Sequence, residues 1–279
     1  MKKKNMLTSI VLILFFIAVS ILFLFPLYYL VMASFKPADE LFRNGLDFSI
    51  NLDLMNLNNY RLLFTDGGGV YLSWYKNSLL ITALYTGLGL FLSSMVGYGL
   101  GAYQFKGRNF IFLLVLFVLM MPVEILMLPL YKLMISLGMI NKYSGVILPF
   151  VVSPIAVFFF RQFVSGLPKD FIDAGRIDGC TEIGIFFRIM VPLMAPAFGA
   201  MGILLAMQSW HNFIWPLIVL RTNEMLTLPI GLASMLTPYG NNYDKLIAGS
   251  VLAIIPIIIV FLFNQRAFIS GLTAGGVKG

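Results

Sequence analysis

The sequence contains few charged residues and few residues that bind metals or form disulfides. Lys, Arg, Asp and Glu make up 11% of its 279 residues, against about 25% in an average soluble domain. One cysteine, Cys180, excludes an internal disulfide framework, and one histidine, His211, excludes a cluster of Cys and His ligands. No G-x-x-x-x-G-K-[ST] motif occurs, so the chain does not bind a nucleotide through a P-loop. These absences point to a protein of the lipid bilayer.

Long apolar runs account for most of the chain, whose mean hydropathy is +0.92. A helix needs about 20 mostly apolar residues to cross a bilayer. We therefore expect an all-α integral membrane protein with six transmembrane helices, at roughly 7–33, 77–103, 109–131, 143–163, 192–220 and 246–264. The first run is longer than the core of a signal peptide and no cleavage site ends it, so we expect an uncleaved anchor. The glycines between 87 and 101 indicate close helix packing.

The distribution of basic residues predicts the orientation of these helices. With the N-terminus inside, 11 of the 19 Lys and Arg residues lie on the cytoplasmic side and 8 outside. The net charge of +7 then reflects topology, and no nucleic-acid partner is needed to explain it. We expect a multi-pass membrane protein with both termini in the cytoplasm.

One polar segment, "PKDFIDAGRIDGCTEIGIFFRIMVP" (168–192), lies between two apolar runs on the predicted cytoplasmic side. Pro168 can open a helix, and Asp170 and Asp173 then fall in its first turns, where the helix dipole favours acidic groups. Asp178-Gly179 is a turn signal, and Asp178 is placed to cap the helix that follows. The sequence therefore predicts a short exposed helix and a sharp turn.

The second helix of this segment has an apolar stripe at i, i+3, i+4 and i+7, which indicates a helix along the membrane surface: Ile183, Phe186, Phe187 and Met190. An ordinary loop is the alternative interpretation of the segment. A plain connection needs only a few residues, however, whereas this one contains about 28. A protruding helix fixed to a membrane span would suit contact with a soluble partner, and Gly175 would allow a close approach.

The segment resembles the cytoplasmic loop of ATP-binding-cassette (ABC) importer permeases, whose pattern is E-A-A-x-x-D-G-A-(x)8-P. The corresponding stretch here is "DAGRIDGC" (173–180), followed by Pro192 at a slightly longer spacing. The resemblance extends over nearly the whole chain and narrows to the carbohydrate, maltose-type class through stretches such as "SWHNFIWPL" (209–217) and "GLTAGGVKG" (271–279). Where that class usually has Asn and an acidic residue after the tryptophan, this chain has His211-Asn212.

The resemblance implies the type I importer permease fold with a cytoplasmic coupling helix. An N-terminal anchor helix and outer loop would occupy 1–76, a core permease domain 77–268 with a coupling loop at 165–191, and a cytoplasmic tail 269–279. The implied partners, besides the bilayer, are a second homologous permease subunit, a dimer of ATPase subunits and an extracytoplasmic sugar-binding protein. ATP and Mg would bind to the ATPase subunits, so we expect no catalytic residue, metal or cofactor in this chain.

The implied function is the permease subunit of a sugar importer, for oligosaccharides in particular, in which ATP hydrolysis drives alternating access. Residues expected to couple to the ATPase are Asp173, Ala174, Gly175, Asp178 and Gly179. Residues expected to contact the ATPase from the tail are Gly275, Gly276 and Lys278. Candidates for a substrate pathway are Glu124, Trp210, His211 and Asn212. A turn expected to contact the sugar-binding protein contains Pro238, Tyr239, Gly240 and Asn241.

Other interpretations remain open from the residues alone. An ion-coupled secondary transporter or channel would be expected to bury several charges and often to contain inverted repeats. Here only Glu124 lies deep in a span, and no repeat is evident. An intramembrane hydrolase would need a nucleophile and a base at membrane depth, and His211 has no obvious Ser partner. Glu124 could instead pair near the outer interface, and His211 and Asn212 could form interhelical hydrogen bonds.

Overall fold

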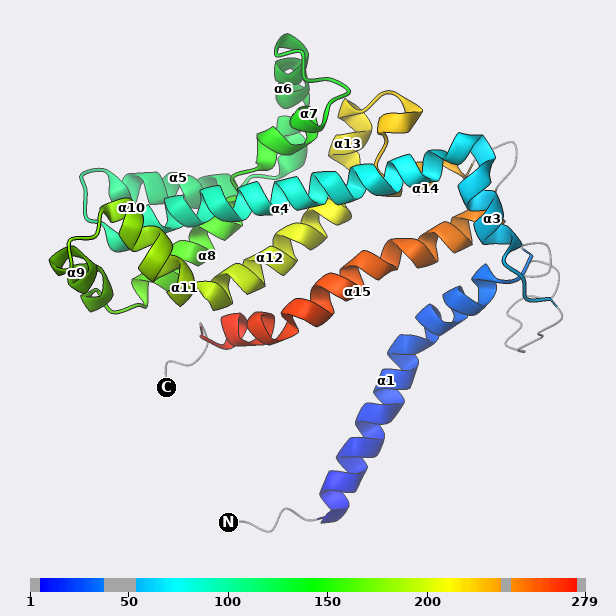
Figure 1. The fold of residues 1–279 in the computed structure, drawn as a ribbon, viewed down its shortest axis with the longest axis horizontal. Helices are drawn as coiled ribbons and strands as arrows, with labels where there is room; N and C mark the ends of the chain where they lie inside the picture. Colours follow the sequence, from blue (N-terminus) through cyan, green and yellow to red (C-terminus); the bar gives the residue numbers. More distant parts are fainter. Residues whose placement is uncertain (1–5, 38–53, 237–241, 275–279) are drawn as a thin grey trace. The chain divides into compact units, whose positions relative to one another are not determined.

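The computed structural model describes residues 6–37, 54–236 and 242–274, and these residues are predominantly helical (Figure 1). The chain divides into two compact units. The first contains Met1–Leu72 and Leu232–Ile255, and the second contains Ser73–Gly231 and Pro256–Gly279. Two long helices, α4 (Val70–Ala102) and α15 (Tyr243–Ala274), contribute residues to both units. The candidate sites described below lie within the second unit.

The first unit contains α1 (Met6–Ser34), α3 (Asn58–Thr65) and the 3-10 turn η1 (Asp66–Gly69). None of the apolar window of α1 is buried inside the chain, which is consistent with a helix surrounded by lipid. The end of α1 is fixed by Asn59, whose side-chain amide donates hydrogen bonds to the carbonyls of Ser34 and Lys36, both at 2.9 Å. The amine of Lys245 lies 3.0 Å from the carboxylate of Asp66.

The second unit adds several shorter helices to α4. They are α5 (Arg108–Met120), α6 (Val123–Ser136), α7 (Tyr143–Ile147), η2 (Leu148–Phe150), α8 (Pro154–Ser165), α9 (Asp170–Ile177), α10 (Glu182–Ile185), η3 (Phe186–Met190), α11 (Val191–Leu193), α12 (Ala195–Trp210), α13 (Ile214–Val219), η4 (Asn223–Met225) and α14 (Leu228–Ser234), the last of which continues into the first unit. Their core includes Phe160, Ile185, Leu205 and Trp215, each no more than 2% exposed.

Three helical stretches are long and apolar enough to cross a membrane alone: Thr8–Ser34, Asn58–Ala102 and Tyr243–Phe263. Three pairs of shorter helices meet the same criteria together, and each pair is bent at its break: Arg108–Met120 with Val123–Ser136, Tyr143–Phe150 with Pro154–Ser165, and Glu182–Leu193 with Ala195–Trp210. If each bent pair is counted as one span, the described residues contain the six spans that the sequence predicts.

The run at 109–131 is not the single helix that we expected. It is bent by 100° between α5 and α6. Pro122 has no N–H to donate to the carbonyl of Val118, and it favours an extended conformation at the preceding residue. Met121 indeed has φ −79° and ψ 126°. Glu124 therefore lies in the first turn of a new helix rather than in the middle of a straight span.

The run at 192–220 is also interrupted, contrary to our prediction. Helix α12 ends at Trp210, and α13 begins at Ile214. Pro216 lies inside α13 and cannot donate a hydrogen bond to the carbonyl of residue 212, which weakens the helix at this point. The break at 211–213 exposes polar backbone and side chains next to membrane helices, and such irregular backbone is typical of segments that line a cavity.

The glycines of α4 confirm the predicted close packing at Gly97 and Gly101 but not at Gly87 or Gly99, where an added Cβ would have no atom within 4 Å. A Cβ at Gly97 would lie 2.5 Å from the Phe160 Cβ and 3.0 Å from the backbone nitrogen of Arg161. A Cβ at Gly101 would lie 2.9 Å from the Val164 Cβ. Gly97 and Gly101 are four residues apart and share one face of α4. They let the backbone of α4 approach α8 more closely than any side chain would allow.

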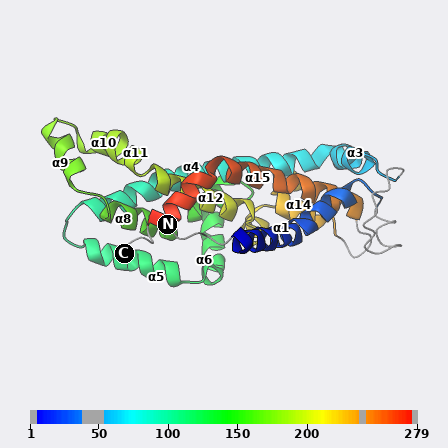
Figure 2. The ribbon, with the colours of Figure 1, turned by 90° about the horizontal axis from the view of Figure 1, so that it is seen from below.

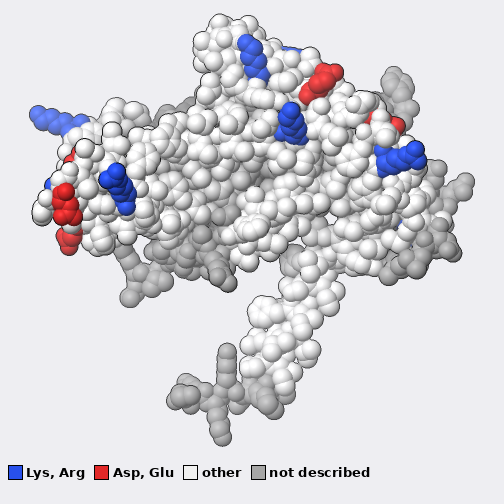
Figure 3. Space-filling model, viewed as in Figure 1, with Lys and Arg blue, Asp and Glu red and all other residues white. Residues whose placement is uncertain are grey.

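The charged side chains of the second unit gather in two places on the face shown in Figure 3. In Figure 1 and Figure 2, α9 and α10 extend at one end of α4, and α6 lies away from them. On the face shown in Figure 3, charged side chains gather over α9 and α10 and again near α6 and the first turns of α4. The surface between these two groups is uncharged, as expected for a band inside a bilayer.

Candidate functional site

The first candidate site is the coupling segment, defined here as residues 168–193 with the helices α9, α10, η3 and α11. Helix α9 ends in a Schellman motif, because the N–H of Cys180 donates to the carbonyl of Gly175 at 2.9 Å and that of Gly179 to Arg176 at 3.1 Å. Gly179 has φ +76°, a conformation that glycine adopts without the strain other residues suffer. The predicted sharp turn at Asp178-Gly179 is confirmed.

The cap of the next helix is a different residue from the one that we expected. Asp178 is the C-cap of α9, where its N–H donates to Ala174. The side chain of Thr181 instead caps α10, accepting a hydrogen bond from the N–H of Gly184 at 3.1 Å. A threonine followed by an acidic residue in the first turn is a favourable start for a helix. The sequence "TEIG" at 181–184 carried this signal.

Helix α9 has one face against the chain and one face exposed. Ile172 and Gly175 are buried. A Cβ at Gly175 would lie 2.7 Å from the Ile189 Cδ1, so the group that approaches this glycine closely is η3 of the same chain. The exposed face contains Phe171, Ala174 and Ile177, and Ile177 is 86% exposed. Together with Phe171, which is 43% exposed, it gives the outer face of α9 a small apolar surface.

The apolar stripe that we expected on the second helix is divided between two faces. Phe186 and Met190 are buried, at 4% and 1% exposure, whereas Ile183 and Phe187 are 70% and 47% exposed. The helix contains a π turn over Phe186–Met190, which inserts an extra residue and rotates the side chains that follow. The inner face packs into the core of the second unit. The outer face remains apolar, as expected for a helix along a membrane surface.

Polar contacts join α9 to α10 and to the end of α4. The guanidinium of Arg176 lies 2.8 Å from the carboxylate of Glu182 and 3.3 Å from that of Asp173. The hydroxyl of Tyr103 donates to Glu182 as well and lies 3.0 Å from the hydroxyl of Tyr98 in α4. Hydrogen bonds from Arg176 and then Tyr103 lower the pKa of the Glu182 carboxyl. Sequence reasoning missed Tyr103 and Glu182, since no pattern connects residues so far apart.

Replacing Glu182 with glutamine is expected to decrease the Tm of the purified chain slightly at pH 7, by up to about 4 °C, because the pair is exposed. The lowered pKa means that the carboxylate contributes stability above its ordinary pKa and loses it as the pH falls through the lowered value. The difference in Tm between parent and Glu182→Gln should therefore disappear in acid. A difference that persists unchanged in strong acid would contradict this role of the charge.

The second candidate site is a cavity of about 380 Å³ in the second unit. Its polar lining is Ser78, Tyr85, Glu124, Gln208, Ser209, His211, Asn212 and Thr227. These residues come from α4, from the first turn of α6, from the end of α12 and the break after it, and from the residue before α14. The cavity lies where the two interrupted runs meet.

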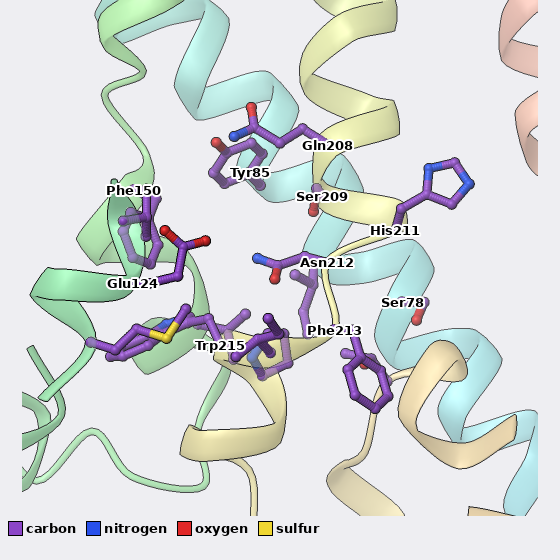
Figure 4. Close-up of a pocket in the computed structure, with 17 residues that line it drawn as sticks. Ser78, Tyr85, Glu124, Phe150, Gln208, Ser209, His211, Asn212, Phe213 and Trp215 are labelled. Carbon is purple, nitrogen blue, oxygen red and sulfur yellow. The ribbon is translucent and has the colours of Figure 1, made fainter. Parts of the chain in front are cut away.

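The close-up shows how the labelled side chains of this cavity are directed. Glu124, Gln208 and Asn212 point toward one common space beside Tyr85 (Figure 4). The ring of His211 points away from that space (Figure 4), and its Nδ1 lies 3.0 Å from the carbonyl of Met207. The structure thus brings together Glu124 and Asn212 of the predicted pathway. The signal for Gln208 was a polar residue four positions before Asn212 in an apolar span, and Tyr85 gave no signal.

Trp210 does not line this cavity, although we grouped it with Glu124 and Asn212. Its side chain is 4% exposed and packs edge-to-face on Tyr75 with the ring centroids 5.9 Å apart. It lines a separate hollow of about 680 Å³ along α4, α12 and the later half of α15. Trp210 lies two positions before Asn212, so on a helix the two side chains point in different directions.

Three further expectations concern metal binding, the turn at 238–241 and the C-terminal tail. Within the described ranges, no group of three or more His, Cys, Asp or Glu side chains could hold a metal ion. The turn with Pro238, Tyr239, Gly240 and Asn241 and the tail residues Gly275, Gly276 and Lys278 lie outside the described residues. Helix α15 extends to Ala274, so the first part of the glycine-rich stretch at 271–279 is helical.

A sequence model of one protein family covers the coupling segment and most of the cavity. The model of the family described as "Binding-protein-dependent transport system inner membrane component" matches residues 89–272. The chain belongs to this family. The matched range includes the whole coupling segment and every cavity residue from Glu124 onward. Membership of a family of inner membrane components explains the long apolar helices of this chain.

Named relatives match along almost the whole chain. The arabinooligosaccharides transport system permease protein AraQ of Bacillus subtilis (strain 168) is 61% identical over 270 residues, covering 97% of this chain and 96% of AraQ. AraQ of Halalkalibacterium halodurans is 56% identical over 278 residues, covering 100% of this chain and 99% of that protein. The trehalose/maltose transport system permease protein MalG of Thermococcus litoralis is 30% identical, with 99% of both chains covered.

A solved structure supports the fold. A bacterial ABC transporter involved in the import of the acidic polysaccharide alginate contains a chain that matches with a TM-score of 0.82, covering 96% of this chain and 99% of that chain. The two sequences are 20% identical. The binding-protein-dependent permease family and this likeness together establish the type I importer permease fold that the sequence predicted.

Proposed function

We propose that this chain is the permease subunit of an ABC importer for oligosaccharides, in which ATP hydrolysis by partner subunits drives alternating access. The observation that carries the proposal is α9. It is a short helix with a fixed C-terminal cap, a buried inner face and an exposed apolar outer face. Its inner face packs on η3, so a displacement of α9 would move η3 and the spans that follow it. Membership of the binding-protein-dependent family supports the same function.

The proposed partners follow from this function. The outer face of α9, with Asp173, Ala174 and Asp178 exposed beside Ile177, would fit into the surface of an ATPase subunit. ATP and Mg would bind to the two ATPase subunits. A second permease subunit would complete the translocation pathway, and an extracytoplasmic sugar-binding protein would deliver the substrate. The tail residues Gly275, Gly276 and Lys278 and the turn at 238–241 are proposed to contact the ATPase and the sugar-binding protein, respectively.

The substrate that we propose is a neutral oligosaccharide of arabinose. Two relatives with 61% and 56% identity are both named as permeases for arabinooligosaccharides, whereas relatives named for lactose and galactooligosaccharides are about half as similar, at 31% and 30%. Vesicles that contain the complete complex should accumulate arabinotriose delivered by the sugar-binding protein. A panel that includes galactobiose and maltotriose would test the assignment, and preferential uptake of either would contradict it.

A secondary transporter or channel is the competing function. The two functions differ in their energy source. Uptake into vesicles should require ATP and Mg on the ATPase side and should be unaffected when the proton and sodium gradients are abolished. Accumulation driven by an ion gradient without ATP would refute the proposed importer.

The proposed orientation places both termini and α9 in the cytoplasm. Leu57, which is 66% exposed after the first span, would then face outside, and the exposed Lys106 after the second span would face inside. In a Cys180→Ser background, Leu57→Cys should react with a membrane-impermeant thiol reagent in intact cells, and Lys106→Cys only after permeabilisation. Labelling of Lys106→Cys in intact cells would contradict the topology.

A further inference from the structure

We infer that the cavity at the breaks after α5 and α12 is a sugar-binding subsite within this subunit, and that Glu124 and Asn212 are its principal hydrogen-bonding groups. The inference rests on the proposed function and makes it more specific. It assigns to this chain a direct contact with the substrate, and it predicts that the subsite accepts neutral sugars and disfavours acidic ones.

The cavity contains several polar side chains with unused hydrogen-bonding capacity. In the described part of the chain, no hydrogen bond or ion pair involves the side chains of Tyr85, Glu124, Gln208 or Asn212. The hydroxyl of Thr227, a residue only 4% exposed, also lacks a partner among described residues and lines the same cavity. Tyr85 and Thr227 are buried, Asn212 is half-buried, and Glu124 and Gln208 are exposed. Because buried polar groups usually find partners, the unused hydroxyls of Tyr85 and Thr227 beside three accessible polar side chains indicate a place for a polar ligand.

The walls around these groups are held in position by hydrogen bonds of their own. The indole N–H of Trp215 donates to the carbonyl of Gly145 at 3.0 Å, and Trp215 is 2% exposed. The hydroxyl of Ser78 accepts a hydrogen bond from the N–H of Leu228 at 2.8 Å. Phe150 packs edge-to-face on Trp215 with the ring centroids 5.5 Å apart. The cavity is therefore a preformed site with fixed aromatic walls and free polar groups.

This combination suits a sugar ring. The hydroxyls of a sugar can donate to the carboxylate of Glu124, and they can both donate to and accept from the amides of Gln208 and Asn212. The ring of Phe150, which is half-buried and lines the cavity, can contact the apolar C–H face of the sugar ring. A cavity of about 380 Å³ lies at the lower end of the range of about 300–1,000 Å³ for ligand sites. One or two sugar units of an oligosaccharide would be accommodated.

The charge of the cavity predicts which sugars it accepts. Its lining includes one carboxylate, Glu124, and no Lys or Arg. A hydrogen bond from a neutral hydroxyl to a carboxylate is stronger than one to a neutral acceptor. A sugar that carries its own carboxylate would instead be repelled, and repulsion of this kind is an effective source of specificity. Glu124 is thus a specificity-determining residue for neutral oligosaccharides.

The test uses the complete importer in proteoliposomes, supplied with the sugar-binding protein loaded with arabinotriose. Glu124→Gln keeps the shape of the side chain and removes its charge. It is expected to decrease the amount of arabinotriose transported per ATP hydrolysed by about tenfold, the effect of losing a hydrogen bond to a charged group. Stimulation of ATP hydrolysis by the loaded binding protein should remain within about twofold of the parent. Glu224→Gln is the matched control and should transport at the parental ratio, because Glu224 is exposed and does not line the cavity.

A second measurement reports directly whether a sugar occupies the cavity. In a Cys180→Ser background, Asn212→Cys should react with a small neutral maleimide, and millimolar arabinotriose should slow that reaction at least about threefold. An arabinooligosaccharide that carries a glucuronic acid should protect less, and adding Glu124→Gln should remove that difference. Parental transport by Glu124→Gln together with no protection at Asn212→Cys would overturn the subsite.

Two other outcomes are also decisive. Loss of both transport and stimulated ATP hydrolysis in Glu124→Gln would mean that Glu124 maintains a subunit contact, and this would refute its role as a substrate ligand. If the parent complex itself transports no oligosaccharide while its ATPase is active, the proposed function fails. If the parent transports and the variants behave like the parent, only the subsite fails.

Discussion

Replacing Gly179 with valine is expected to reduce ATP-driven uptake by the complete importer at least about tenfold. Gly179 has φ +76°, and a β-branched residue at a positive φ is a severe outlier. Strain of this kind costs about 1–3 kcal/mol, and about 1.4 kcal/mol corresponds to a factor of ten. The Schellman bonds of Cys180 and Gly179 would be distorted, and α9 would lose the position in which its outer face meets the ATPase.

Two control variants separate strain at this turn from strain in general. Gly179→Asn should retain most of the uptake, because asparagine tolerates the left-handed conformation. Gly107 has φ +89° before α5, and a Cβ added at Gly107, like one added at Gly179, would have no atom within 4 Å. Gly107→Val should therefore be equally strained but should retain coupling. Parental uptake by Gly179→Val in an assembled complex would contradict the role of α9.

The second large effect is expected on stability, from Gly97→Ala in α4. The new methyl group would lie 2.5 Å from the Phe160 Cβ and close to the backbone of α8, which cannot move aside without displacing the helix. Overpacking of this kind costs about 1–3 kcal/mol, and each kcal/mol corresponds to roughly 2–4 °C in Tm for a chain near this size. The Tm of the purified protein in detergent should decrease by several degrees.

Gly99 provides a control in the same helix, two residues away. No atom lies within 4 Å of a Cβ added at Gly99. Because alanine is favoured over glycine inside helices by about 0.5–1 kcal/mol, Gly99→Ala should leave the Tm unchanged or raise it slightly. A decrease in Tm for Gly97→Ala with no decrease for Gly99→Ala would confirm the α4–α8 packing. Equal effects at the two positions would show that α4 and α8 are not packed through Gly97.

Much of the fold could be predicted from the sequence, because the hydropathy of a span is a property of its own residues. The bends within the spans could not be predicted in the same way. Pro26 and Pro256 lie inside the continuous helices α1 and α15, whereas Pro122 and Pro216 accompany breaks. A proline in a membrane span is tolerated when neighbouring groups satisfy the carbonyl that it leaves free, and the identity of those neighbours depends on the tertiary structure.

In the candidate sites, too, the features with a local sequence signal were predictable and those that depend on the tertiary structure were not. The turn at Gly179 was predictable, because an Asp-Gly pair is a local signal for a turn. The positions of Ile183 and Phe187 were not, since the π turn at Phe186–Met190 changes the helical periodicity on which the predicted stripe depended. Glu124 and Asn212 were candidates by chemistry alone. Their convergence with Tyr85 and Gln208 depends on two helix breaks that lie far apart in the sequence.

The most direct measurement of the central claim is site-specific photo-crosslinking from α9 in the assembled importer. A benzophenone amino acid at Ile177, which is 86% exposed on the outer face, should crosslink to the ATPase subunit. The same group at Ile183, which is 70% exposed on the neighbouring helix and is expected to face lipid, should not. A complex that contains the ATPase but gives no crosslink from Ile177, or an equal crosslink from Ile183, would contradict the proposal that α9 receives the ATP-driven movement.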